Sequence, residues 1–163
     1  MPEEMHVRVG VAAVLWRPSI VALRPDRRQV LMGRRKGSHG AGTWAFPGGK
    51  PDLYESIVAT AARELVEEAG VVVAATRFKK KTFTNDVFVT EGKHFVTLYV
   101  EALWRPSDGE PRVMEPEKCE EWRWFDEAPS PLFPPVQNLM KDGFDPWAVR
   151  EALTVEAVEA LLG

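Results

Sequence analysis

The sequence has a single cysteine, Cys119, and this scarcity excludes two kinds of small protein. One thiol cannot close a disulfide within the chain, and it cannot supply a cysteine-rich metal site. We therefore interpret Cys119 as a small, half-buried structural thiol. A reducing, cytoplasmic setting fits this cysteine usage best.

Long apolar runs and an excess of positive charge are also absent. No apolar stretch approaches the roughly 18 residues that a membrane-spanning helix needs. The opening residues, MPEEMHVRV, lack the basic-then-apolar order of a signal peptide. A net charge of -3 and a pI near 5.7 leave no basic surface that would follow a nucleic-acid backbone. We expect neither a membrane nor a nucleic-acid polymer among the partners.

Apolar residues are plentiful enough to build one core. The chain has 163 residues, of which 45% are hydrophobic and six are tryptophan. A chain of this length folds most simply as a single domain over residues 1–163.

Segments with strand-like and helix-like patterns follow one another along the chain. Predominantly apolar or alternating segments predict strands, and Glu91-Gly92-Lys93 predicts a hairpin turn between two of them. The predicted strands cover 6–16, 28–34, 44–46, 71–90, 94–104 and 119–125, and the predicted helices cover 55–69, 134–141 and 147–162. This interleaving predicts an α/β domain with a layered, mixed sheet.

Three glutamates share one turn of the predicted helix over residues 55–69. At about 100° per residue, Glu64, Glu67 and Glu68 lie on an arc beside the apolar arc. The apolar arc consists of Val58, Ala61, Ala62, Leu65 and Ala69. Like charges at this spacing repel one another, and more strongly where water is excluded. A cation relieves that repulsion, and carboxylate oxygens suit Mg²⁺ or Mn²⁺ rather than Zn²⁺. By itself the pattern is also typical of a solvated acidic helix face.

Residues 49–71 form a motif that favours the metal site. Their sequence, GKPDLYESIVATAARELVEEAGV, follows the Nudix box: Gly, five residues, Glu, seven residues, Arg-Glu, an aliphatic residue, any residue, Glu-Glu, any residue, Gly, aliphatic. The fixed identities are Gly49, Glu55, Arg63, Glu64, Glu67, Glu68 and Gly70, with Leu65 and Val71 at the aliphatic positions. Seven such identities match by accident about once in 10^8 windows. The chain therefore resembles the Nudix hydrolases.

The spacing of the box indicates what its residues do. The adjacent glycines Gly48 and Gly49 let a backbone carbonyl approach a metal, which a side chain would obstruct. Glu55 lies at the expected helix start, where an anion is favoured and also fixes the loop. Arg63 directly precedes Glu64 and is placed to orient it by a bidentate contact.

The resemblance adds ligands and catalytic roles. It implies that Glu64, Glu67 and Glu68 bind metal together with the carbonyl of Gly48. Family members differ over the general base, and we assign Glu64 to that role, with Arg63 and Glu67 assisting. Some relatives use an acidic residue five positions before the tryptophan of the late strand, which here is Glu117; a solvated loop glutamate is the alternative.

The resemblance covers most of the chain, from about residue 7 to residue 146. The segments RRKGSHGAGTWAFPGG (34–49), MEPEKCEEWRWF (114–125) and KDGFDP (141–146) resemble the MutT-like branch that hydrolyses nucleoside triphosphates, including oxidised or thio-substituted guanine nucleotides. It implies an α/β/α sandwich, release of a monophosphate and pyrophosphate, and a homodimer. It also implies that Arg35 and Lys50 face the phosphates.

Two positions depart from the family pattern. Tyr54 stands where the family often has glycine just before the first glutamate of the box, so the conformation of that loop is open. Ala45 stands where base-reading relatives carry Asn or Gln, and alanine cannot hydrogen-bond a base edge. The aromatic neighbours Trp44 and Phe46 then either wall a pocket for a flat ring or belong to the core.

We expect a metal-dependent hydrolase that cleaves nucleoside triphosphates to a monophosphate and pyrophosphate. Another diphosphate substrate, such as dihydroneopterin triphosphate, a nucleotide sugar or an isoprenyl diphosphate, is the alternative within enzymes. A nucleotide-binding module without turnover is a different class, but such modules would be expected to have lost box carboxylates that this chain keeps. Cap removal from RNA is disfavoured by the acidic pI.

Overall fold

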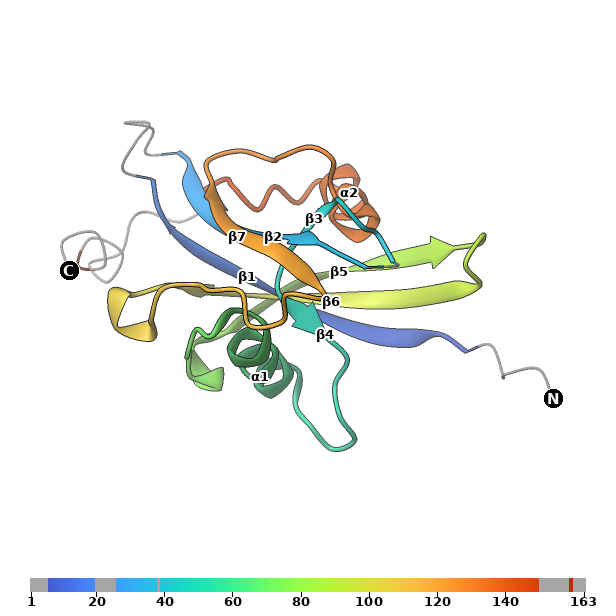
Figure 1. The fold of residues 1–163 in the computed structure, drawn as a ribbon, viewed down its shortest axis with the longest axis horizontal. Helices are drawn as coiled ribbons and strands as arrows, with labels where there is room; N and C mark the ends of the chain where they lie inside the picture. The colour runs from blue at the N-terminus through green and yellow to red at the C-terminus, as the bar shows by residue number, and fades with distance from the viewer. Residues whose placement is uncertain (1–5, 20–25, 38, 150–158, 160–163) are drawn as a thin grey trace.

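A mixed β-sheet forms the centre of the molecule in the computed structural model (Figure 1). The structure describes residues 6–19, 26–37, 39–149 and 159. The main path of the sheet runs β3-β2-β1-β6-β5, while β4 pairs with β1 and β7 pairs with β2. The strands are β1 (Arg8–Pro18), β2 (Arg28–Arg35), β3 (Trp44–Ala45), β4 (Gly48–Gly49), β5 (Lys79–Phe88), β6 (Lys93–Leu103) and β7 (Cys119–Phe125).

The central strand β1 is covered on both faces, as its nearly continuous apolar sequence predicts. It runs parallel to β6 and antiparallel to β2 and β4. Val11 and Ala13 belong to one core cluster with the helix α1 (Ile57–Ala69). Ala12 and Val14 belong to a second cluster with the helix α2 (Pro134–Lys141). The two helices lie on opposite sides of the sheet (Figure 1), which confirms the α/β sandwich with a mixed sheet.

The helix α1 begins and ends at well-defined caps. The Ser56 hydroxyl accepts a hydrogen bond from the Ala59 amide, and Gly70 ends the helix in the left-handed conformation that glycine adopts without strain. Of the predicted apolar arc, Ala61, Leu65 and Ala69 are fully buried. The prediction that the helix starts at Glu55 is wrong by two residues, because Ser56 supplies the cap.

The segment between α1 and β5 is not the long strand that we predicted over residues 71–90. Val71 and Val73 are buried in the α1 core cluster, but a 3-10 turn over Ala75–Arg77 follows them, and pairing with β6 begins at Lys79. Valine is typical of strands, but these two side chains are buried because they pack against α1. A second short 3-10 turn, Pro106–Asp108, follows β6.

The C-terminal helix predicted over residues 147–162 does not begin where expected. Trp147 is fully buried, and Ala148 forms an isolated β-bridge with Arg27. Neither residue therefore starts a helix. Nearly all of the remaining predicted helix lies outside the described residues. Within the described part of the chain, no helix combines the length and the apolar character needed to cross a membrane.

Candidate active site

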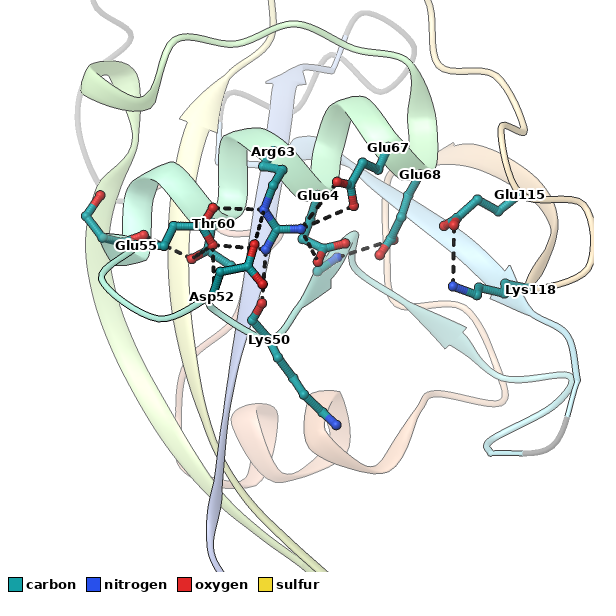
Figure 2. A network of polar contacts seen from close by, with 12 residues as sticks. Lys50, Asp52, Glu55, Thr60, Arg63, Glu64, Glu67, Glu68, Glu115 and Lys118 are labelled. Atoms are coloured by element: carbon teal, nitrogen blue, oxygen red, sulfur yellow. Dashed lines mark hydrogen bonds and ion pairs between the residues drawn. The ribbon is translucent and has the colours of Figure 1, made fainter.

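Arg63 holds together the loop before α1 and the acidic face of the helix (Figure 2). Its guanidinium makes a bidentate contact with Glu55, with Nε–Oε2 at 2.8 Å and Nη2–Oε1 at 2.9 Å. Thr60 also donates its hydroxyl hydrogen to Glu55, at 2.7 Å. The hydrogen bonds from Arg63 and Thr60 lower the pKa of Glu55 to about 2. Glu55 is therefore ionised throughout the physiological range and acts as an anchor for the loop.

The same guanidinium reaches the carboxylates of α1. Nη1 lies 3.0 Å from Glu64 Oε1 and 3.2 Å from Glu67 Oε2, while Nη2 donates to the Lys50 carbonyl at 3.0 Å. Arg63 thus contacts Glu64 through one nitrogen only. The predicted bidentate contact exists, but its partner is Glu55 and not Glu64.

Glu64 and Glu68 face one another at the inner edge of this network, and the amide of Gly48 points at Glu68 at 3.4 Å. Burial raises the pKa of Glu64. Burial and then the charge of Glu64 raise the pKa of Glu68 to about 9. One proton shared between the two carboxyls offsets their repulsion in the metal-free protein.

The glycines of β4 leave room for these carboxylates. A Cβ on Gly49 would lie 2.2 Å from Glu64 Oε1, and a Cβ on Gly48 would lie 2.2 Å from the Val11 carbonyl oxygen. Both distances are shorter than any real contact, so a side chain at residue 48 would collide with the backbone of β1 and one at residue 49 would displace the Glu64 carboxylate. The backbone of β4 therefore lies close to both carboxylates.

The donor set fits a hard divalent cation. Glu64 and Glu68 bring two carboxylates against a bare glycine backbone, and burial, joined at Glu68 by the charge of Glu64, raises their pKa values; a bound cation would offset both effects. In the described ranges, no three acidic, histidine or cysteine side chains already converge on one ion position. Arg63 instead occupies one oxygen of Glu64 and draws Glu67 away.

A charged cleft of about 690 Å³ opens over these residues. Besides the α1 carboxylates it is lined by Arg35, Lys50, Glu115 and Lys118. Burial lowers the pKa of Arg35, which nevertheless remains a cation, and its Nε donates to the His39 carbonyl at 2.9 Å. The cleft therefore combines carboxylates for a metal with cations for an anionic ligand.

A second cavity, of about 240 Å³, continues from the charged cleft to the α2 side of the sheet. We call it the ring pocket. Its walls are largely aromatic and aliphatic, and they include Phe88, Phe95, Phe133 and Val136. The two cavities share Arg35, His39, Ala45, Phe46, Gly48, Gly49 and Lys50.

The structure brings most of the predicted site residues together. Arg35, Phe46 and Lys50 line both cavities, and Glu117 lines the charged cleft as an exposed residue. Trp44 does not belong with them. Its side chain is 6% exposed, and its ring packs edge-on against that of Phe125 with a centroid separation of 4.8 Å. Because it belongs to the α2 core cluster, it is a core residue and not a wall of the pocket.

Sequence reasoning missed Glu115 and His39. Glu115 lies near enough to Glu68 to contribute to raising its pKa, and it pairs with Lys118 at 3.3 Å. The ring of His39 lies edge-on to the rings of Phe88 and Phe133, with centroid separations of 4.9 and 5.4 Å. Its Nδ1 lies 3.1 Å from Glu91 Oε2. Counting back five positions from Trp122 selected Glu117 and passed over Glu115. No sequence signal linked His39 to the β5–β6 hairpin.

Burial raises the pKa of Cys119 to about 11, and its thiol lies 3.2 Å from the Glu121 carbonyl oxygen. The half-buried, protonated thiol agrees with the structural role that we predicted.

Relatives with known names match parts of this chain. The "Putative 8-oxo-dGTP diphosphatase 3" of Mycobacterium tuberculosis is 35% identical over 97 residues, which cover 58% of this chain and 43% of that protein. The "Oxidized purine nucleoside triphosphate hydrolase" of Danio rerio is 43% identical over 54 residues, one third of each chain. The chain thus spans less than half the length of these curated relatives.

Solved structures show the same fold over a larger part of the chain. A MutT NUDIX hydrolase from Burkholderia pseudomallei superimposes with a TM-score of 0.65 at 31% identity, covering 78% of this chain and 90% of the other. A MutT/nudix family protein from Enterococcus faecalis gives a TM-score of 0.63 at 25% identity over 80% of this chain and 48% of the other.

The match to the NUDIX domain extends over residues 15–140, well over half of the chain. It contains the helix α1, the glycines of β4 and Arg63 with its carboxylate partners. Together with the Burkholderia structure, this match places the chain in the Nudix family.

Proposed function

We propose that this protein is a divalent-metal-dependent pyrophosphohydrolase that cleaves nucleoside triphosphates to a monophosphate and pyrophosphate. The continuity of the charged cleft with the ring pocket carries this proposal, because it gives one ligand a polyanionic end and a flat apolar end. The names of the two curated relatives support purine nucleoside triphosphates as the substrate class, oxidised ones included.

Residues of this chain supply binding and proton transfer. Glu64 and Glu68, with the backbone of β4, would hold Mg²⁺ or Mn²⁺. When bound, such an ion polarises a phosphoryl oxygen and lowers the pKa of a coordinated water. Arg35 and Lys50 bind the phosphate chain, and Arg63 keeps Glu64 and the loop in position. Glu64 is the group that we assign to accept the proton of the attacking water.

The test is product analysis over a substrate panel. The protein is incubated with Mg²⁺ and with nucleoside triphosphates, a nucleotide sugar and a dinucleotide, and the products are separated by ion-exchange chromatography. We expect pyrophosphate and a nucleoside monophosphate from the triphosphates. Inorganic phosphate as the first product, or action on the nucleotide sugar alone, would contradict the proposal, as would binding of a triphosphate without any turnover.

We also propose that the protein forms a homodimer. The six tryptophans do not supply the contact surface, since all of them are buried or half-buried within the chain. The support comes instead from an exposed apolar surface on the α1 side of the sheet. On that face Val11 of β1 pairs with Leu98 of β6, and Leu98 pairs with Phe83 of β5. The exposed apolar side chains there are Val9, Phe83 and Val87, which are 41%, 63% and 54% exposed. Light scattering at micromolar concentration should give twice the chain mass, which Phe83→Lys should reduce to the monomer mass; a wild-type monomer would contradict it.

A further inference from the structure

A carboxylate is buried behind the ring pocket, outside the charged cleft. Asp86 on β5 is 0% exposed and accepts three hydrogen bonds from neutral groups. Thr84 donates its hydroxyl hydrogen to Oδ2 at 2.9 Å, and the hydroxyl of Thr97 donates to the same oxygen. The Asn138 amide of α2 donates to Oδ1 at 2.9 Å. Burying a carboxylate without such donors would cost several kcal/mol of folding free energy. The three donors are therefore held in their direction towards Asp86.

These contacts fix the direction of the Thr97 hydroxyl group. A hydroxyl has one hydrogen to donate and two lone pairs to accept with, whereas a carboxylate only accepts. The hydrogen of Thr97 is therefore directed at Asp86, and the oxygen of Thr97 is left with accepting capacity alone. The neighbouring Tyr99 hydroxyl is occupied in the same way, since it donates to the Pro135 carbonyl at 3.0 Å and lies 3.1 Å from Thr84.

Thr97 is also a wall residue of the ring pocket. It lies on β6, is half-buried and lines the cavity beside Phe95 and Tyr99. On the adjacent strand, β1 carries Gly10 at the position that pairs with Thr97. The place where a Cβ on Gly10 would stand is 3.8 Å from Thr97 Oγ1, so the glycine keeps this oxygen uncovered.

We propose that Thr97 determines specificity in the ring pocket as a hydrogen-bond acceptor whose direction is set by Asp86. The pocket then prefers a heterocycle that presents an N–H group to Thr97 over one that presents a lone pair or a C–H there. This inference rests on the proposed function, because it takes the base of a nucleotide to be the occupant of the ring pocket. Thr97 touches the ring, whereas Asp86 acts through Thr97 as a positioning residue.

The test compares matched nucleotides that differ by an N–H donor on the base, which is an exocyclic amino group in the first two pairs and a ring N–H in the third. The pairs are GTP with ITP, ATP with purine riboside triphosphate, and 8-oxo-dGTP with dGTP. For the wild type we expect one pair to favour the donor-bearing member by about 10-fold in kcat/KM, the scale of one hydrogen bond made or left unpaired. Thr97→Val has nearly the same shape but no oxygen, and it should bring that ratio to within about 2-fold of unity. Thr97→Ser keeps the hydroxyl and should retain the preference.

A variant of Asp86 tests the positioning step. In Asp86→Ala the Thr97 hydroxyl is free to turn and to donate, so dGTP, which presents a lone pair at N7, should gain and the ratio of 8-oxo-dGTP to dGTP should fall below the wild-type value. If this variant does not fold, as judged by circular dichroism, the comparison of Thr97→Val with Thr97→Ser decides alone. An unchanged ratio in folded Asp86→Ala would show that Asp86 does not direct Thr97.

Failure of the inference can be told apart from failure of the proposed function. The same ratios are measured as Kd for the monophosphates GMP against IMP and AMP against purine riboside monophosphate, which need no turnover. Turnover in the wild type with ratios that Thr97→Val leaves unchanged would overturn the role of Thr97 and leave the proposed function intact. Absence of turnover with ratios that do depend on Thr97 would overturn the proposed function and leave the specificity role standing.

Discussion

The charged cleft and the ring pocket differ in how their residues are distributed along the chain. The acidic centre of the cleft comes from one continuous segment, from Gly48 through Glu68, which contains β4, the following loop and most of α1. The ring pocket draws on distant segments, including Gly10, Thr97 and Phe133, which come together only in the folded sheet. The acidic centre of the cleft therefore depends on local sequence, whereas the shape of the ring pocket depends on the packing of α2 and the β5–β6 hairpin.

Removal of the metal should separate the two regions most sharply. We expect EDTA to abolish hydrolysis and Mg²⁺ or Mn²⁺ to restore it, because the carboxylates alone neither polarise a phosphate nor activate water. Binding of a nucleoside monophosphate in the ring pocket should persist in EDTA, as measured by calorimetry. Full turnover in chelator would contradict the metal requirement.

The pH dependence of metal binding follows from the same pair of glutamates. Glu68 has an ordinary pKa of 4.5 and a folded-state pKa of about 9, so the protonated form is favoured by folding. In the metal-free protein its stabilising contribution is complete below about pH 4.5 and is lost as the pH rises towards 9. Mg²⁺ binds the ionised form and must displace the proton. The rise in Tm on adding Mg²⁺ should therefore grow between pH 6 and 9, and a rise that shrinks over this range would contradict the shared proton.

Loss of a carboxylate should act on the phosphate end alone. Glu64→Gln and Glu68→Gln should each lower kcat by at least about 100-fold, the scale for losing a base or a metal ligand. The matched change Glu67→Gln should cost less, because this side chain is 50% exposed and is turned towards Arg63. Glu117→Gln should also have a smaller effect. Steady-state kinetics at saturating Mg²⁺ provide the measurement, and wild-type rates in the Glu64 and Glu68 variants would remove α1 from the active site.

A change in the wall shared by the two cavities should alter substrate choice more than rate. Ala45→Asn adds a donor and an acceptor where the wild type has neither, so we expect the ratio of kcat/KM between guanine and adenine triphosphates to change by about 10-fold. Ala45→Val is the matched control, since it adds volume without polarity. Equal effects of the two substitutions would show that space, and not hydrogen bonding, limits the wild-type pocket.

The smallest effect concerns the backbone of the loop before α1. Tyr54 has a φ of 70° and is 98% exposed, so it carries left-handed strain without a packing gain. Tyr54→Gly should relieve about 1 kcal/mol and raise Tm by about 2–4 °C. Activity should stay within about twofold, because Arg63 and Asp52 still hold Glu55. Calorimetry decides, and a lower Tm would mean that the tyrosine ring stabilises the loop.

Sequence reasoning succeeded where a signal repeats over a short distance. The bounds of β7 and α2 agree with the predicted segments, and β2 differs by one residue. It failed where long-range packing overrides local composition. Val71 and Val73 have strand-like character but pack beneath α1, and Trp147 was assigned to a helix but lies buried on the sheet side. The bidentate partner of Arg63 was misassigned because a neighbour in sequence was preferred to Glu55, eight residues away.

The sequence by itself determined the family and the acidic centre, because the Nudix box lies within 23 consecutive residues. Helical periodicity alone brings Glu64, Glu67 and Glu68 to one face. Only the tertiary structure decided that Glu64 and Glu68 are buried with raised pKa values, that Trp44 is a core residue, and that the Thr97 hydroxyl donates to Asp86. Burial and the direction of a hydroxyl hydrogen depend on groups from other strands and helices. The local sequence does not indicate which of these groups come into contact.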